Sequence, residues 1–234
     1  MDRLFSNKIR GETAEPEKLM SSAIWLITYQ LQHDREGDYV AWFHDIHMPE
    51  KLARPGYTWA AHYRTPSAEE SDTGARYVAL FGGESSAVFY NPSPAQLALT
   101  QPPETRDMMG CRIGSCSLIL SGEWAINGSD VIESDCSPVE SNSIGLTLCD
   151  AGGNDMDFSA WLLQEHVPSL NSCGISKFLT SSGDARHTII HTPEADAALP
   201  PFADPTGEEW EARVADYITY PLGNPLIEMD RISP

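Results

Sequence analysis

Basic side chains are scarce in this 234-residue sequence, which has 15 lysines and arginines against 34 aspartates and glutamates. The formal net charge of -19 repels polyanions, so the sequence argues against binding to nucleic acid or to an anionic membrane surface. A run of about 18 apolar residues is also missing, so we predict no membrane-spanning helix. Residues 1–8 lack the apolar core of a signal peptide, which favours a cytoplasmic location.

Several motifs of known chemistry are absent as well. The five cysteines are odd in number and form no Cys-x-x-Cys pair, which argues against a disulfide framework or a zinc ribbon. The sequence has no Gly-x-Gly-x-x-Gly, no Gly-x-Ser-x-Gly and no His-Glu-x-x-His. His44 and His47, with His33 or His62, could bind a divalent metal, but exposed polar histidines without a metal are the alternative. We predict no metal site and no cofactor.

The apolar pattern predicts strands and helices in an order that occurs twice. Residues 1–21 are polar and read as an arm, residues 22–121 as the first unit, residues 122–142 as a linker and residues 143–234 as the second unit. Each unit has the order strand, helix, strand, strand, helix, strand, which is that of a ferredoxin-like fold. The predicted strands are 24–31, 57–64, 76–81, one within 112–120, 144–149, 174–180, 186–191 and 226–232. The predicted helices begin at Asp38, within 92–109, at Asp157 and at Glu208.

The first helices of the two units align without gaps, residues 38–49 on residues 157–168. Identical residues stand at five of the twelve aligned positions. These pairs are Asp38/Asp157, Ala41/Ala160, Trp42/Trp161, His47/His166 and Pro49/Pro168. We interpret the match as a duplication, with both aspartates as helix N-caps. The alternative is that the two segments are unrelated amphipathic helices that share an N-cap residue and a proline that ends the helix.

Duplication has a physical consequence for the fold. A ferredoxin-like unit covers one sheet face with helices and leaves the other face bare, so a second unit can cover it. We therefore predict an α+β protein in which two βαββαβ repeats close one barrel within a single chain. A homodimer of this chain remains compatible with that architecture.

The residues around the first helix resemble a known family. Trp42-Phe43, His47, Pro49-Glu50 and Pro55-Gly56, followed by His62-Tyr63-Arg64 and Arg76–Leu80, resemble the EthD-like proteins of the dimeric α+β barrel superfamily. The resemblance covers about residues 22–120, and only Trp161, Glu165-His166, Pro168 and Gly174 carry it in the second half. Ile46 departs from the family, which commonly has glutamate before the histidine.

The resemblance implies a function class rather than one reaction. Members include cofactor-free monooxygenases, cyclases, isomerases and haem enzymes, and a histidine near the end of the first helix is a recurring acid–base candidate. This carries over to His47 and, in the second copy, to His166. Imidazole titrates near neutrality and so suits proton transfer. A histidine at a helix end can instead cap the last carbonyls, and that alternative stays open.

Other residues complete the predicted site. Tyr63, Arg64 or His62 is expected to polarise a carbonyl or stabilise an enolate. Tyr57, Trp59 and Tyr63 alternate along one strand face, where they either line an aromatic pocket or fill the core. The remaining predicted substrate-binding residues are His44, Trp42 and Trp161, of which the tryptophans equally suit core packing.

Together these features favour a cofactor-free enzyme of isomerase, cyclase or monooxygenase type. Its substrate is expected to be a small hydrophobic or aromatic molecule, and a helix-end histidine in a hydrophobic pocket is expected to move a proton. The alternative is a ligand-binding or structural protein of the same fold without turnover. Haem binding, as in some relatives, is a third hypothesis.

Overall fold

A computed structural model describes residues 23–66, 76–127, 141–170, 173–180, 185–193, 199, 201–221, 223 and 226–232. Within these ranges the predicted order of elements occurs twice, and all eight predicted strands are present. The predicted arm, residues 1–21, lies outside the described residues. No helix in the described ranges is long and apolar enough to cross a membrane.

The first half contains four strands and a two-part helical layer. Its elements are β1 (Ala23–Leu31), η1 (His33–Arg35), α1 (Glu36–Trp42), η2 (Phe43–His47), α2 (Met48–Leu52), β2 (Tyr57–Arg64), β3 (Arg76–Gly83), η4 (Ser86–Tyr90), α3 (Pro94–Thr100), α4 (Pro103–Met109) and β4 (Arg112–Asn127). The segment η2 is a π-helical turn between α1 and α2, so the three form one continuous helix.

The second half has the same order of strands and helices. Its elements are β5 (Ser143–Cys149), α5 (Asp155–Trp161), η6 (Leu162–His166), α6 (Val167–Ser169), β6 (Cys173–Thr180), β7 (His187–Pro193), α7 (Glu209–Tyr217) and β8 (Ile227–Arg231). Here too a π-helical turn, η6, directly follows a tryptophan and ends in a histidine. Trp42 and Trp161 therefore occupy equivalent places.

The eight strands form one closed antiparallel barrel in the order β1-β3-β2-β8-β5-β7-β6-β4. Each half contributes four neighbouring strands. The halves join where β2 pairs with β8, through Tyr63 and Arg231, and where β4 pairs with β6, from Leu120 to Asn127. The predicted α+β barrel, closed within one chain by two ferredoxin-like halves, is confirmed.

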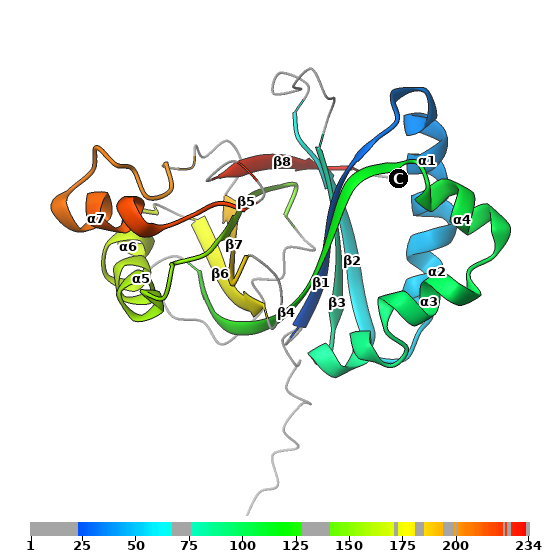
Figure 1. Cartoon of the computed structure of the whole chain (residues 1–234), viewed down its shortest axis with the longest axis horizontal. Coiled ribbons are helices and arrows are strands. Elements are labelled where there is room, and N and C mark those ends of the chain that lie inside the picture. The colour runs from blue at the N-terminus through cyan, green and yellow to red at the C-terminus, as the bar shows by residue number, and fades with distance from the viewer. Residues whose placement is uncertain are drawn as a thin grey trace, which may run out of the picture.

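Three hydrophobic clusters account for the packing. The barrel interior combines both halves, with Ile24, Leu26 and Leu80 from the first beside Ile144, Leu146 and Met229 from the second. The other two clusters lie outside the barrel, one under the helices of each half. Figure 1 shows these helical layers on opposite sides of the barrel, with α1 to α4 on one side and α5 to α7 on the other. Each fully buried leucine or isoleucine stabilises such a core by roughly 1.5–3 kcal/mol.

The structure corrects two boundaries. The first helices begin at Glu36 and Asp155, not after Asp38 and Asp157, and no side chain caps either start. In the first half the chain passes from η1 directly into α1, so Asp38 lies inside the first turn, where its charge still complements the helix dipole. Strand β4 continues to Asn127, beyond the expected unit boundary at 121, because β6 pairs with this extension. Most of the expected linker, residues 128–140, lies outside the described residues.

A third correction concerns the predicted aromatic strand face. The pairing of β2 with β3 shifts register between Tyr57 and Trp59. Tyr57 therefore packs under the helices against Phe81 and Phe89, whereas Trp59 and Tyr63 belong to the barrel interior. A one-residue shift in pairing moves a side chain to the opposite sheet face, and no local pattern in the sequence indicated this shift.

Candidate functional site

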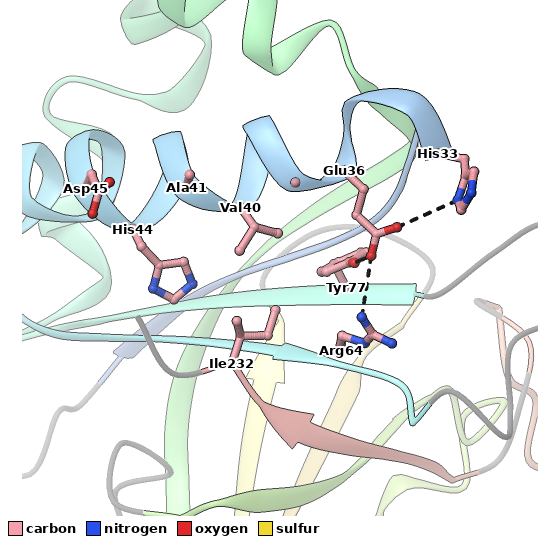
Figure 2. Close-up of a pocket in the computed structure, with 10 residues that line it drawn as sticks. His33, Glu36, Val40, Ala41, His44, Asp45, Arg64, Tyr77 and Ile232 are labelled. Carbon is pink, nitrogen blue, oxygen red and sulfur yellow. Dashed lines mark hydrogen bonds and ion pairs between the residues drawn. The ribbon is translucent and has the colours of Figure 1, made fainter.

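An open groove of about 590 Å³ lies between the first helix and the strands of the first half. In Figure 2, Val40 and His44 point from the helix toward the strands, with Tyr77, Arg64 and Ile232 below them. The middle of the groove is apolar, and His44 stands toward one end of it. A second, smaller hollow of about 190 Å³ also contacts His44 and is bordered by His62. His44 is thus accessible from two sides.

A chain of hydrogen bonds runs from His44 into the protein. Nε2 of His44 lies 3.1 Å from Nδ1 of His62, and Nε2 of His62 lies 2.8 Å from the hydroxyl of Tyr29. His44 comes from η2, His62 from β2 and Tyr29 from β1, so three elements meet here. Nδ1 of His44 has no hydrogen-bond partner within the described residues. A bound molecule could therefore use this nitrogen.

The environment keeps these groups neutral at pH 7. Burial lowers the pKa of His44 below 6.5, and burial lowers the pKa of His62 well below 6.5, with His44 and Arg112 adding to that shift. Burial also raises the pKa of Tyr29 well above 10. A neutral imidazole has one donor and one acceptor nitrogen, so the direction of the protons along the chain decides whether Nδ1 of His44 accepts or donates. His44 can serve as a general base in one direction and as a general acid in the other.

Aromatic rings and one cation enclose the buried end of the hydrogen-bonded series His44–His62–Tyr29. His62 packs on Phe43, with 4.5 Å between ring centroids, and on Tyr77 at 5.5 Å. The guanidinium of Arg112 lies 4.3 Å above the Tyr29 ring, and its Nε donates to the Tyr39 hydroxyl at 2.6 Å. The cation disfavours protonation of the nearby histidines, which reinforces the neutral state of His62.

The end of the groove opposite His44 is held by Glu36. Its carboxylate accepts a hydrogen bond from the Tyr77 hydroxyl and pairs with Arg64 at 3.5 Å, as the dashed lines in Figure 2 show. These contacts tie the first turn of α1 to β2 and β3. The groove therefore has one end with a fixed ion pair and another with an imidazole, separated by apolar side chains.

The predicted catalytic residues lie apart from one another. His47 is 2 % exposed, packs on Trp42 with 4.7 Å between ring centroids, and lines neither hollow beside His44. Tyr63 lies inside the barrel and donates to the carbonyl of Ser141 at 3.2 Å. Successive strand residues face opposite sides of a sheet, so Tyr63 and its neighbour His62 lie on opposite faces. The first half brings together His44, His62 and Arg64 from the predicted set, and it leaves Trp42, Tyr57 and Trp59 in packed surroundings.

The second half has a histidine pair of its own. Nε2 of His166 lies 3.0 Å from Nε2 of His191, and burial lowers the pKa of His166 to about 3 and that of His191 to about 4. His166 borders a hollow of about 440 Å³. Trp161 is buried and stacks on His166, with 5.1 Å between centroids.

The sequence analysis missed Tyr29, Glu36 and Arg112. A tyrosine within an otherwise apolar strand was the available signal, because a buried hydroxyl usually has a hydrogen-bond partner. No feature of the sequence indicated that Arg112 would contact Tyr39 in the first helix. No group of three or more histidine, cysteine or acidic side chains in the described ranges is arranged to hold a metal ion.

Comparisons with known proteins establish the fold alone. No family model matches the sequence, and no curated protein matches it significantly. Among solved structures, an anthrone oxidase-like protein is 9% identical, with 90% of this chain and 91% of the other covered and a TM-score of 0.56. A candidate monooxygenase of Fusobacterium nucleatum subsp. nucleatum is 10% identical, with 90% and 92% covered and a TM-score of 0.54. The chlorite dismutase of Candidatus Nitrospira defluvii in complex with imidazole is 12% identical, with 91% of each chain covered and a TM-score of 0.50.

Proposed function

We propose that this chain is a cofactor-free enzyme that moves a proton on a small, largely apolar carbonyl or phenolic compound bound in the groove beside His44. The hydrogen-bonded series His44–His62–Tyr29 is the observation that carries the proposal. It places a neutral imidazole, held in orientation by buried partners, next to an apolar groove. The names of the structural neighbours, among them an oxidase-like protein and a candidate monooxygenase, are compatible with a small-molecule enzyme of this fold.

The proposed step is the removal of an acidic proton. Nδ1 of His44 accepts the proton from a C–H beside a carbonyl, the C–H electron pair becomes the enolate, and His44 becomes an imidazolium. Nε2 of His44 then donates to Nδ1 of His62, and Nε2 of His62 to the Tyr29 hydroxyl, which fixes the ring orientation. Return of the proton to another carbon completes an isomerisation, and the same enolate suits cyclisation or oxygenation.

This proposal moves the acid–base role from His47 to the histidine three positions before it. His47 and its counterpart His166 remain candidates on the resemblance alone, as does Tyr63. Membership of the EthD-like group and descent by duplication, with units that correspond to the two halves of the barrel, are further parts of the proposal. The equivalent π-helical turns after Trp42 and Trp161 support duplication.

Deuterium exchange tests the proton transfer without knowledge of the natural substrate. In deuterated buffer, 2-tetralone offers an aromatic ring and an acidic C–H beside a carbonyl, and NMR follows its exchange. We expect saturable exchange by the wild type, and a loss of roughly 100-fold or more in kcat/KM for His44→Leu. The rate should fall as the pH drops through the pKa of His44, which lies below 6.5, because the protonated ring cannot accept a proton.

The second half supplies the matched control. Leu163 stands where His44 stands in the aligned first helix and is exposed, so Leu163→Ala should leave exchange unchanged. If the wild type exchanges no faster than His44→Leu, the protein does not catalyse this step. A non-catalytic ligand-binding role would then be the better account.

A further inference from the structure

The hollow beside His166 differs in charge from the groove beside His44. It lies between the α5–α6 helix and the segment that leads into α7, and its volume is about 440 Å³. Four of its lining residues are acidic: Glu165, Asp204, Glu208 and Glu211. No lysine or arginine is among the described residues that line it. A positive ligand is therefore favoured electrostatically, and the net charge of -19 adds to this at long range.

The acidic side chains are held in place. The Asp204 carboxylate accepts hydrogen bonds from the backbone N–H and the hydroxyl of Thr206, which lower the pKa of Asp204. Glu211 accepts from the backbone N–H of Asp204 at 3.1 Å, so α7 and the segment before it are tied together. These contacts orient the Asp204 and Glu211 carboxylates, and neither carboxylate has a cationic partner among the described residues.

A buried histidine gives an independent sign of a ligand. His166 is 4 % exposed and lines the hollow, and its Nε2 is engaged by His191. Its other nitrogen, Nδ1, has no hydrogen-bond partner in the part of the chain that the structure describes. When Nε2 donates to His191, Nδ1 is left as an acceptor. A nearly buried acceptor in an acid-lined hollow suits a ligand that brings N–H donors.

We propose that this second-half hollow is a binding site for a protonated organic amine. The ammonium group donates to the acidic side chains and to Nδ1 of His166, and its carbon skeleton packs beside Trp161. A bare metal ion fits less well, because no three potential ligands in the described ranges converge on one point. The site does not depend on the proton transfer proposed for the groove beside His44.

Calorimetric titration with tryptamine tests the proposal, because tryptamine joins an ammonium group to an aromatic ring. Tryptophol, which replaces that ammonium by a hydroxyl, is the matched neutral ligand. We expect one saturable tryptamine site per chain and binding of tryptophol that is at least about tenfold weaker. Equal affinities would overturn the proposal, because the hollow would then recognise shape and not charge. The absence of saturable tryptamine binding would also overturn it.

Paired variants separate this site from general charge effects. Glu165→Gln with Glu208→Gln should weaken tryptamine binding about tenfold. Glu104→Gln with Glu228→Gln removes the same charge from exposed positions elsewhere and should change binding less than twofold. Equal losses in the two double variants would contradict a localised site. His44→Leu should leave binding unchanged, whereas a loss would place tryptamine in the first groove and overturn the proposal.

A spectroscopic signature tests the role of His166 directly. Tryptamine should shift the ¹⁵N resonance of His166 Nδ1 toward that of a hydrogen-bonded acceptor nitrogen, with His166→Gln used for assignment. A His166 that only packs on Trp161 would show no such change, and that result would remove His166 from the proposed site.

Discussion

The two halves of the barrel share a backbone plan but carry different histidine pairs. In both, a tryptophan ends the first helix, a π-helical turn follows and a buried histidine ends the turn. In the first half the polar contact starts from the second residue of the turn, His44, and runs to β2. In the second half it starts from the last residue, His166, and runs to β7.

This difference shows which features the packing requires. In both halves the buried tryptophan and the buried histidine pack on each other, so this contact belongs to the shared framework. His44 corresponds to the exposed Leu163, and Lys51 corresponds to the buried Leu170 when the same alignment is extended by two residues. The polar side chains have thus changed while the framework stayed the same.

Acid should destabilise both halves, and this is the largest effect that we expect. Burial holds the pKa of His47 and His166 at about 3 and that of His191 at about 4, whereas the unfolded chain takes up these protons near 6.5. The free energy of unfolding is therefore highest above pH 6.5 and falls as the pH drops toward 3–4. Each histidine contributes up to about 1.4 kcal/mol per pH unit, so several kcal/mol are lost by about pH 5.

Urea denaturation at pH 7, 6 and 5 measures this loss. His47→Gln should reduce the slope of the free energy of unfolding against pH by about one proton. The reason is that position 47 then no longer takes up a proton when the chain unfolds. A free energy of unfolding that stays constant or rises between pH 7 and pH 5 would contradict the prediction.

Removal of the Tyr29 hydroxyl should affect the first half alone. Tyr29→Phe deletes the buried partner of His62, so His44 loses part of its orientation. We expect a decrease of roughly tenfold in kcat for deuterium exchange, with little change in KM because Tyr29 does not line the groove. Tyr57→Phe, which removes a hydroxyl from the aromatic packing near Phe89, is the control. Equal rates for Tyr29→Phe and wild type would show that His44 needs no support from Tyr29.

The smallest expected effect concerns the Lys51/Leu170 pair. Lys51 is 3 % exposed, its ammonium lies 6.0 Å from the Trp25 ring centroid, and burial lowers its pKa. Lys51→Leu should raise the free energy of unfolding by about 1 kcal/mol, because a buried charge gives way to an apolar side chain. Leu170→Lys should lower it. Thermal and urea denaturation measure both changes, and a less stable Lys51→Leu variant would assign Lys51 a favourable role.

The order and the approximate bounds of the strands could be read from the sequence, because alternation and apolar runs are local signals. The place of the first helices and their equivalence came from one short alignment. Tyr57 was misplaced because a register shift between Tyr57 and Trp59 depends on the partner strand β3. His44 and His62 were both candidates, but neither their direct contact nor its extension from His62 to Tyr29 was predicted.

By itself the sequence determined a chain with two similar sets of strands and helices, each with one bare sheet face to cover. Only the tertiary structure decided which histidines meet, because His44, His62 and Tyr29 come from three elements brought together by sheet pairing and helix packing. The same holds for the hollow beside His166, where α7 and the segment before it bring acidic side chains to a helix that is distant in sequence. Side-chain chemistry is encoded locally, but distances between distant residues are set by the closure of the barrel.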